Sequence, residues 1–196
     1  MYALLIFSFL CAPFEVEVTS GLGGIIWEEP VVVTVPAMES SSMTAWTARM
    51  HMDGHWWAGA SMLLNAYKGR HPDFAGPIFG VMDVMGYYRI KMGHWQLNLG
   101  MGAAVGVLHV RRYVAQPVGE DVPPGHYELF VPSVYAAFSG AFLHRLHPRL
   151  LVGVSLRYYS GLNGGPCWEG PASDCEGVDR QTQHWAFGAS VIVISP

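Results

Sequence analysis

Six charged residues stand singly within otherwise apolar stretches of this 196-residue chain. A carboxylate and a guanidinium group that come together can form a salt bridge, and a row of such groups can also line a polar conduit or relay protons. An unpaired charge in an apolar environment is very costly, so pairing is the expected arrangement. We therefore predict a plug of paired side chains in the interior of the fold, with a polar conduit and a proton relay as the alternatives. The predicted members are Glu15, Glu17, Arg49, Asp83, Arg89 and Arg157.

Nine histidines raise the question of a metal site. Two ligands on one face of a β-strand would be two residues apart, and the sequence contains no His-x-His. His51 and His55 flank one expected turn, while His144 and His147 flank another. We expect these turn histidines to be solvated, and we predict neither a metal site nor a cofactor.

The elements that position the charged residues must be short, because the apolar residues are dispersed along the chain. Charged residues make up 13% of the sequence, against about 25% in an average soluble protein, and the mean hydropathy is +0.25. A membrane-spanning helix needs ~20 consecutive apolar residues. Beyond the N-terminal stretch, Gly, His, Asn or Arg interrupts every apolar run. Many short strands fit this composition better than a few long helices.

Eight segments alternate between a bulky apolar face and a small or polar face, with the period of two that is typical of β-strands. The alternation is clearest in residues 95–113, where Trp, Leu, Met and Val occupy most odd positions and Gln, Asn, Gly and Ala most even ones. The predicted strands are 14–28, 43–52, 55–67, 78–90, 95–113, 127–143, 150–160 and 183–195.

Short and long connections alternate between these segments. The short ones lie at 53–54, at 92–93 and near 147, and the long ones span 29–42, 68–76, 115–125 and 161–182. This pattern is typical of outer-membrane barrels, which have short periplasmic turns and longer external loops. An even number of strands also closes the sheet, so that no strand edge is left in lipid.

The composition of the two faces separates a membrane barrel from a soluble one. The bulky face is rich in Leu, Val, Met, Phe and Trp over about the ~9–11 residues that cross a bilayer obliquely. The opposite face carries mainly small and polar residues, which suits a narrow lumen, whereas a soluble barrel would carry charges outside. We predict an all-β fold, an eight-stranded antiparallel up-and-down transmembrane β-barrel over residues 14–196, in the bacterial outer membrane.

The strand count, the alternation of loops and the aromatic residues near strand ends resemble those of the OmpA-like family of small outer-membrane β-barrels. The resemblance implies assembly from the periplasm and a narrow lumen. It implies no particular function, since this architecture serves structural proteins, adhesins, small pores and lipid-modifying enzymes. The chain departs from the family pattern at its end, where Ile194-Ser195-Pro196 stands in place of a terminal aromatic residue.

The resemblance also provides a test for enzymatic activity. Lipid A deacylases of this architecture use a histidine and a serine two residues apart on one strand face, so that the imidazole activates the hydroxyl. The sequence contains no His-x-Ser, and its nearest segment, 157–160, has Tyr158 where the base belongs. A lipid A-modifying enzyme is therefore only a distant alternative.

Two further predictions concern segments outside the strands. Residues 1–13 are predicted to be either a remnant of a signal peptide or an apolar extension of the first strand. Cys167 and Cys175 lie in one loop rich in Gly and Pro, and in an exported protein we predict that they form a disulfide.

The partners follow from charge and location. The net charge of −4 and the absence of a Lys/Arg cluster argue against nucleic acid. Beyond the apolar series of strand 95–113 lie His109, Arg111 and Arg112, which we predict either to contact lipopolysaccharide phosphates or to form an ordinary solvated rim. The loop 161–182 is a candidate contact for an external protein or glycan. The predicted function is a structural or surface-interaction role, and a narrow transport pore is the alternative.

Overall fold

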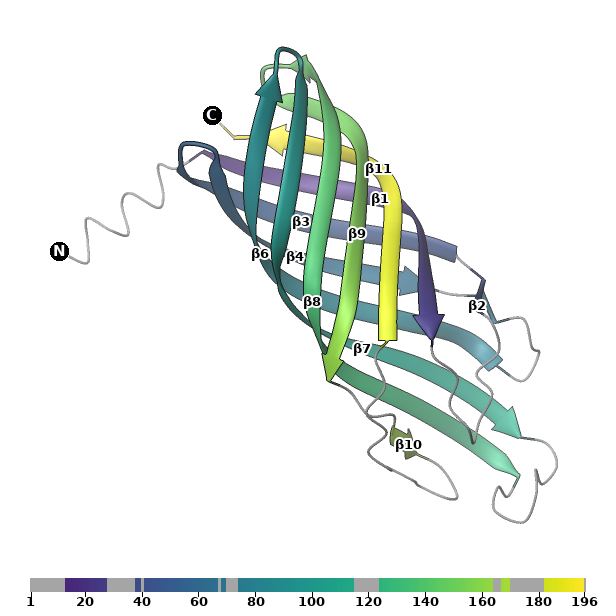
Figure 1. The fold of residues 1–196 in the computed structure, drawn as a ribbon. Helices are drawn as coiled ribbons and strands as arrows, with labels where there is room; N and C mark the ends of the chain where they lie inside the picture. The colour runs from purple at the N-terminus through teal and green to yellow at the C-terminus, as the bar shows by residue number, and fades with distance from the viewer. Residues whose placement is uncertain are drawn as a thin grey trace.

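Eight long antiparallel strands form a ring, which β8 closes by pairing with β9 (Figure 1). The computed structural model describes residues 13–27, 38–39, 41–66, 68–69, 74–114, 124–163, 167–169 and 182–195. Around the ring the order is β8-β7-β6-β4-β3-β1-β11-β9, which confirms the predicted eight-stranded barrel. The ring strands are β1 (Phe14–Trp27), β3 (Ser41–Asp53), β4 (Trp56–Ala66), β6 (Phe74–Met92), β7 (Trp95–Val114), β8 (Gly125–His147), β9 (Leu150–Asn163) and β11 (Thr182–Ile194).

Three short strands, which the sequence pattern does not predict, lie beyond the ring. They are β2 (Met38–Glu39), β5 (Lys68–Gly69) and β10 (Cys167–Glu169). β2 pairs with β5, and β10 pairs with β8. No helix long and apolar enough to cross a membrane occurs in the described part of the chain. Residues 1–12 lie outside the described residues, so the signal-remnant interpretation of that segment stays a prediction.

The strands continue past the limits set by the hydrophobic pattern. β6 begins at Phe74, four residues before the predicted start, and the pairing of β7 with β8 continues as far as Val114 opposite Gly125. Hydropathy alternation marks only the part of a strand with one apolar and one polar side, whereas main-chain hydrogen bonds extend wherever a partner is present. The β7–β8 hairpin therefore projects beyond the rest of the wall (Figure 1).

Tight turns close the end of the barrel where β1 begins and β11 ends, which we call the periplasmic end. Gly54 and Gly93 adopt positive φ values of 53° and 63°, which favour glycine over other residues. The third turn contains Pro148 and Arg149. These positions agree with the three predicted short connections, and the long connections join strands at the opposite, extracellular end (Figure 1).

Alternate residues of each strand point out of and into the barrel. The outer wall is formed by large apolar side chains, among them Val84 and Met101, whose exposed fractions are 68% and 66%. The interior is more apolar than the sequence pattern suggests. Besides polar groups, it holds a large cluster that includes Met43, Leu63, Phe79, Tyr135 and Tyr159. A second cluster near the periplasmic end contains Ala141, Leu143, Leu151 and Ile192, which explains why the last strand is apolar on both faces.

Candidate functional site: the charge network of the lumen

All six predicted network residues point into the barrel. β1 contributes Glu15 and Glu17, β3 contributes Arg49, β6 contributes Asp83 and Arg89, and β9 contributes Arg157. None of the six is more than 4% exposed. They are three carboxylates and three guanidinium groups, and they are the only buried Asp, Glu, Lys or Arg residues in the described part of the chain. The buried formal charge is therefore balanced.

Glu15 lies at the centre of a group near the periplasmic end. Arg89 donates to both of its carboxylate oxygens, through Nη1 at 2.9 Å and Nη2 at 2.5 Å. Nη1 of Arg49 lies 3.9 Å from the same carboxylate. Paired donors of this kind give the strongest form of guanidinium–carboxylate contact. Strands β1 and β6 are not neighbours in the ring. The contact of Glu15 with Arg89 therefore joins them across the lumen.

Aromatic rings cover the two guanidinium groups of this periplasmic group. Arg49 donates to Glu17 and lies over the ring of Tyr87, with 4.6 Å between its Cζ and the ring centre. Arg89 lies 3.8 Å over the ring of Trp57. Such cation–π contacts strengthen when water is excluded. The rings therefore stabilise the cations and occupy the space beside them.

Uncharged polar side chains extend the group in two directions. Towards the periplasm, Asn98 accepts from Arg89 at 3.2 Å and from Gln96 at 3.0 Å. Towards the barrel centre, Thr19 donates to Glu17 at 3.0 Å and lies 2.9 Å from the hydroxyl of Ser190. The Ser190 hydroxyl in turn donates to Ser155 at 2.8 Å, so that hydroxyl groups continue the network where the charges end.

A second group surrounds Asp83 at mid-barrel. Arg157 lies 3.4 Å from the Asp83 carboxylate and donates to Ser61 at 2.7 Å and to Thr47. Ser61 donates to Asp83, and the hydroxyl of Tyr159 donates to the same carboxylate at 2.8 Å. Asp83 therefore receives hydrogen bonds from three side chains, and only one of them is charged.

Aromatic side chains fill the lumen on the extracellular side of Asp83. The rings of Phe79 and His184 stack with 3.7 Å between their centres and an interplanar angle of 1°. Tyr135 and Tyr159 lie edge-on to Phe79, at 5.8 and 6.3 Å. All four side chains are buried. Sequence reasoning missed this layer, although Phe79 shares the inward parity of Asp83 and Arg89 on β6 and could have been assigned to the lumen on that basis.

The three predicted rim residues are only partly described. His109 and Arg111 lie on the outer face of β7, and both contact Glu128 of β8, at 3.3 and 3.2 Å. The ring of His109 also stacks on Phe130, with 4.5 Å between the ring centres. The backbone of Arg112 pairs with Tyr127, but its side chain lies outside the described residues. Sequence reasoning did not anticipate Glu128, whose partnership with β7 depends on the strand register.

The predicted disulfide and external loop fall mostly beyond the described residues. Cys167 begins β10 opposite Phe130, while Cys175 is outside the described residues. Most of 161–182 is outside them as well. In the described part of the chain, no group of three His, Cys, Asp or Glu side chains is arranged to hold a metal ion. Ser61, which donates to the buried carboxylate of Asp83, is 6% exposed, so a lipid ester has no direct approach to it.

Comparisons with known proteins show the fold of the chain. No protein-family model matches it, and no curated protein sequence matches it. Among solved structures, it is similar to neisserial surface protein A (10% identity, TM-score 0.56, covering 92% of this chain and 96% of that one). It is also similar to the outer-membrane protease OmpT of Escherichia coli (10%, 0.56, 93% and 97%). A third similar structure is Ail of Yersinia pestis, in complex with a heparin analogue (10%, 0.50, 92% and 98%). At this identity the likeness shows the architecture and no shared activity. The chain has the fold of the small bacterial outer-membrane β-barrels, which supports the predicted location in the outer membrane, and its apolar outer wall fits a lipid bilayer.

Proposed function

We propose that the protein is a non-conducting outer-membrane barrel with a structural or surface-interaction role. The observation that carries this proposal is the balanced and buried charge of the lumen, where three arginines and three carboxylates contact one another. A water-filled pore would leave such groups hydrated and exposed. An eight-stranded barrel is only just wide enough for its own side chains to fill the interior, and the aromatic layer around Phe79 occupies the extracellular half.

Conductance of the refolded protein in a planar bilayer tests this proposal. We expect no steady ion current at neutral pH, because the buried arginine–carboxylate groups and the aromatic layer occupy the lumen. Insertion is checked separately by the change in gel mobility that folded barrels undergo on heating. A steady current from verified single insertions would contradict the plugged lumen and would favour the narrow-pore alternative.

The composition of the external loop 161–182 limits the class of partner that the loop could bind. Its sequence carries four carboxylates and one arginine, Glu169, Asp174, Glu176, Asp179 and Arg180. The Ail structure contains a sulfated heparin analogue, and an acidic loop would repel such a polyanion. We therefore propose that a partner of this loop is a protein with basic character or an uncharged glycan.

The rim of β7 supports a contact with lipopolysaccharide phosphate. Arg111 is 64% exposed and its Nε lies 3.2 Å from Glu128, so much of its guanidinium group faces outward, where it can bind an anion. Arginine binds phosphate through paired donors. We expect Arg111→Glu to weaken the co-purification of lipopolysaccharide by several-fold, measured as lipid A per protein by mass spectrometry. Arg149→Glu, the same charge reversal at the periplasmic end, is the control and should retain as much lipopolysaccharide as the unsubstituted protein. Equal retention in both variants would contradict the contact with Arg111.

A further inference from the structure

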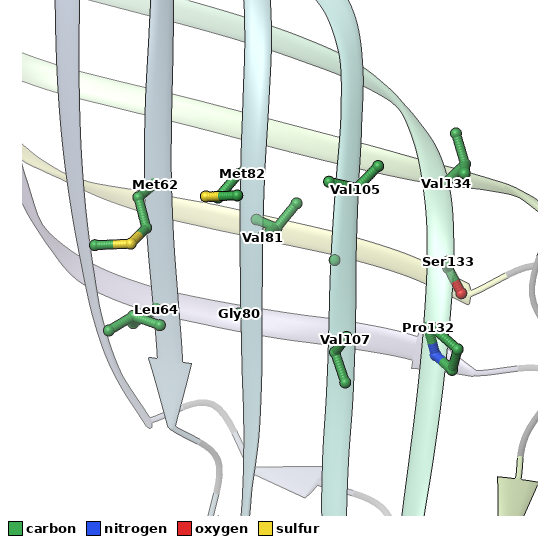
Figure 2. Close-up of a pocket in the computed structure, with 11 residues that line it drawn as sticks. Met62, Leu64, Gly80, Val81, Met82, Val105, Val107, Pro132, Ser133 and Val134 are labelled. Atoms are coloured by element: carbon green, nitrogen blue, oxygen red, sulfur yellow. The ribbon is translucent and has the colours of Figure 1, made fainter.

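A groove on the outer wall lies on the periplasmic side of the rim residues His109 and Arg111. It crosses β4, β6, β7 and β8 and has a volume of about 610 Å³ (Figure 2). Its lining is almost wholly apolar, with Met62, Leu64 and Met82 towards one side and Val107, Pro132 and Val134 towards the other. Ligand sites in proteins commonly have volumes of about 300–1,000 Å³. The groove is therefore large enough to hold one elongated apolar group.

Gly80 creates the depression. It faces outward on β6, between Leu64 of β4 and Val107 of β7, and it is opposite both of them in the strand register. A Cβ atom built on Gly80 would contact only the Cδ2 atom of Leu64, at 3.5 Å. Nothing in the packing of the wall therefore requires glycine at this position, where glycine also weakens a strand. Its effect is to leave the groove open between the bulkier neighbours.

The groove lies in the extracellular half of the wall. Leu64 is two residues from the end of β4, and residues 67–73 separate that end from β6, the next strand of the ring. On β7 the outward series runs from Val105 and Val107 in the groove to His109 and Arg111 on the rim. Two residues of a strand advance by about 7 Å. An apolar chain in the groove would therefore place an attached polar group beside His109 and Arg111.

Glu128 orients the two rim side chains. It contacts Nε2 of His109 at 3.3 Å and Nε of Arg111 at 3.2 Å, and so holds both side chains on the groove side of the β7–β8 hairpin. The Arg111 side chain is 64% exposed and remains accessible to a further anion. The site therefore combines an apolar groove with a guanidinium group at its extracellular end. The groove can bind an acyl chain, and the guanidinium group can bind the phosphate of the same lipid.

We propose that this groove binds one acyl chain of a phosphorylated glycolipid of the outer leaflet, with its phosphate on Arg111 and beside His109. The proposal rests on the lipopolysaccharide contact proposed above and extends it from a rim charge to a built lipid site. It also specifies the outer leaflet, because both the groove and the rim lie in the extracellular half of the wall. A phospholipid of the inner leaflet would not reach these residues.

Gly80→Leu tests the groove without touching the rim. The leucine fills the depression, and we expect at least a tenfold weaker affinity for lipid A, measured by native mass spectrometry of the refolded protein in detergent micelles. The matched control is Gly86→Leu on the same strand, which also faces outward and has no atom within 4 Å of a built Cβ. Both variants should retain the gel-mobility shift of the folded barrel, and lipid A affinity should be unchanged in Gly86→Leu.

Three results separate the possible outcomes. Loss of affinity in both Arg111→Glu and Gly80→Leu supports the complete site. Loss in Arg111→Glu alone overturns the groove and leaves the rim contact of the proposed function intact, whereas no loss in either variant overturns both. Dephosphorylated lipid A and phosphatidylglycerol are the comparison probes. We expect both to bind at least tenfold more weakly than lipid A, and equal binding of either one would overturn the assignment to a phosphorylated glycolipid.

Discussion

Arg157→Met is expected to lower the free energy of unfolding by about 3–5 kcal/mol, which is the usual effect of removing one member of a buried ion pair. The substitution leaves the Asp83 carboxylate with the hydroxyl groups of Ser61 and Tyr159 but without a cation. Thr47 also loses its donor. Urea unfolding of the barrel in micelles, followed by tryptophan fluorescence, measures the loss.

Two comparison variants make this result specific to the buried charge. Arg149→Met makes the same chemical change at an exposed turn and should alter stability by no more than about 0.5 kcal/mol. Adding Asp83→Asn to Arg157→Met removes the uncompensated charge, and it should restore between about 0.5 and 3 kcal/mol. If the double variant is no more stable than Arg157→Met alone, the loss comes from packing and not from an unpaired carboxylate.

Gly153→Ala is expected to prevent folding or to destabilise the barrel by about 3 kcal/mol or more, at the upper end of overpacking effects. A Cβ at this position would collide with the carbonyl oxygen of Phe142 and lie 2.8 Å from the Cα of Leu143. Both are backbone atoms of the neighbouring strand β8, so no side-chain rotation relieves the contact. The fraction of protein that reaches the folded gel mobility after dilution from urea measures the effect.

Gly140→Ala is the matched control for this prediction. Gly140 lies on β8, and a built Cβ there has no atom within 4 Å. We expect its folding yield to equal that of the unsubstituted protein. Equal yields for Gly153→Ala and Gly140→Ala would mean that β8 and β9 can separate at Gly153 without loss, which contradicts the close approach of the two strands.

The fold could be predicted from the sequence because strands and turns leave local patterns in it. Alternation in residues such as 95–113 marks a strand directly, and Asp53-Gly54 marks a turn whose glycine does adopt positive φ. The hydrophobic pattern did not predict the parts of strands that lack one apolar and one polar face. The extracellular part of β6 from Phe74 continues by main-chain pairing with β7, and β10 depends on a partner in β8, so neither required an apolar face.

The contents of the lumen could be predicted from the sequence only in part. The inward position of Asp83 and Arg157 follows from strand parity, but their contact depends on register and curvature across the ring, since 74 residues separate them. The aromatic layer was missed because parity places Phe79 and Tyr135 on the inner face of their strands but does not show that their rings meet there. Glu128 was missed for a related reason, because its role comes from lying opposite Arg111 on β8.

The balanced charge of the lumen has a consequence for how the barrel assembles. Its contacts join distant parts of the chain, since Glu15 meets Arg89, 74 residues away, and Thr19 meets Ser190, 171 residues away. The contact of Thr19 with Ser190 forms only when β1 and β11 have met in the correct register. A shift of one residue would turn every side chain of a strand to the opposite face and bring charges into lipid. The interior ions therefore disfavour misaligned pairing of the strands, because such pairing would place charges in lipid.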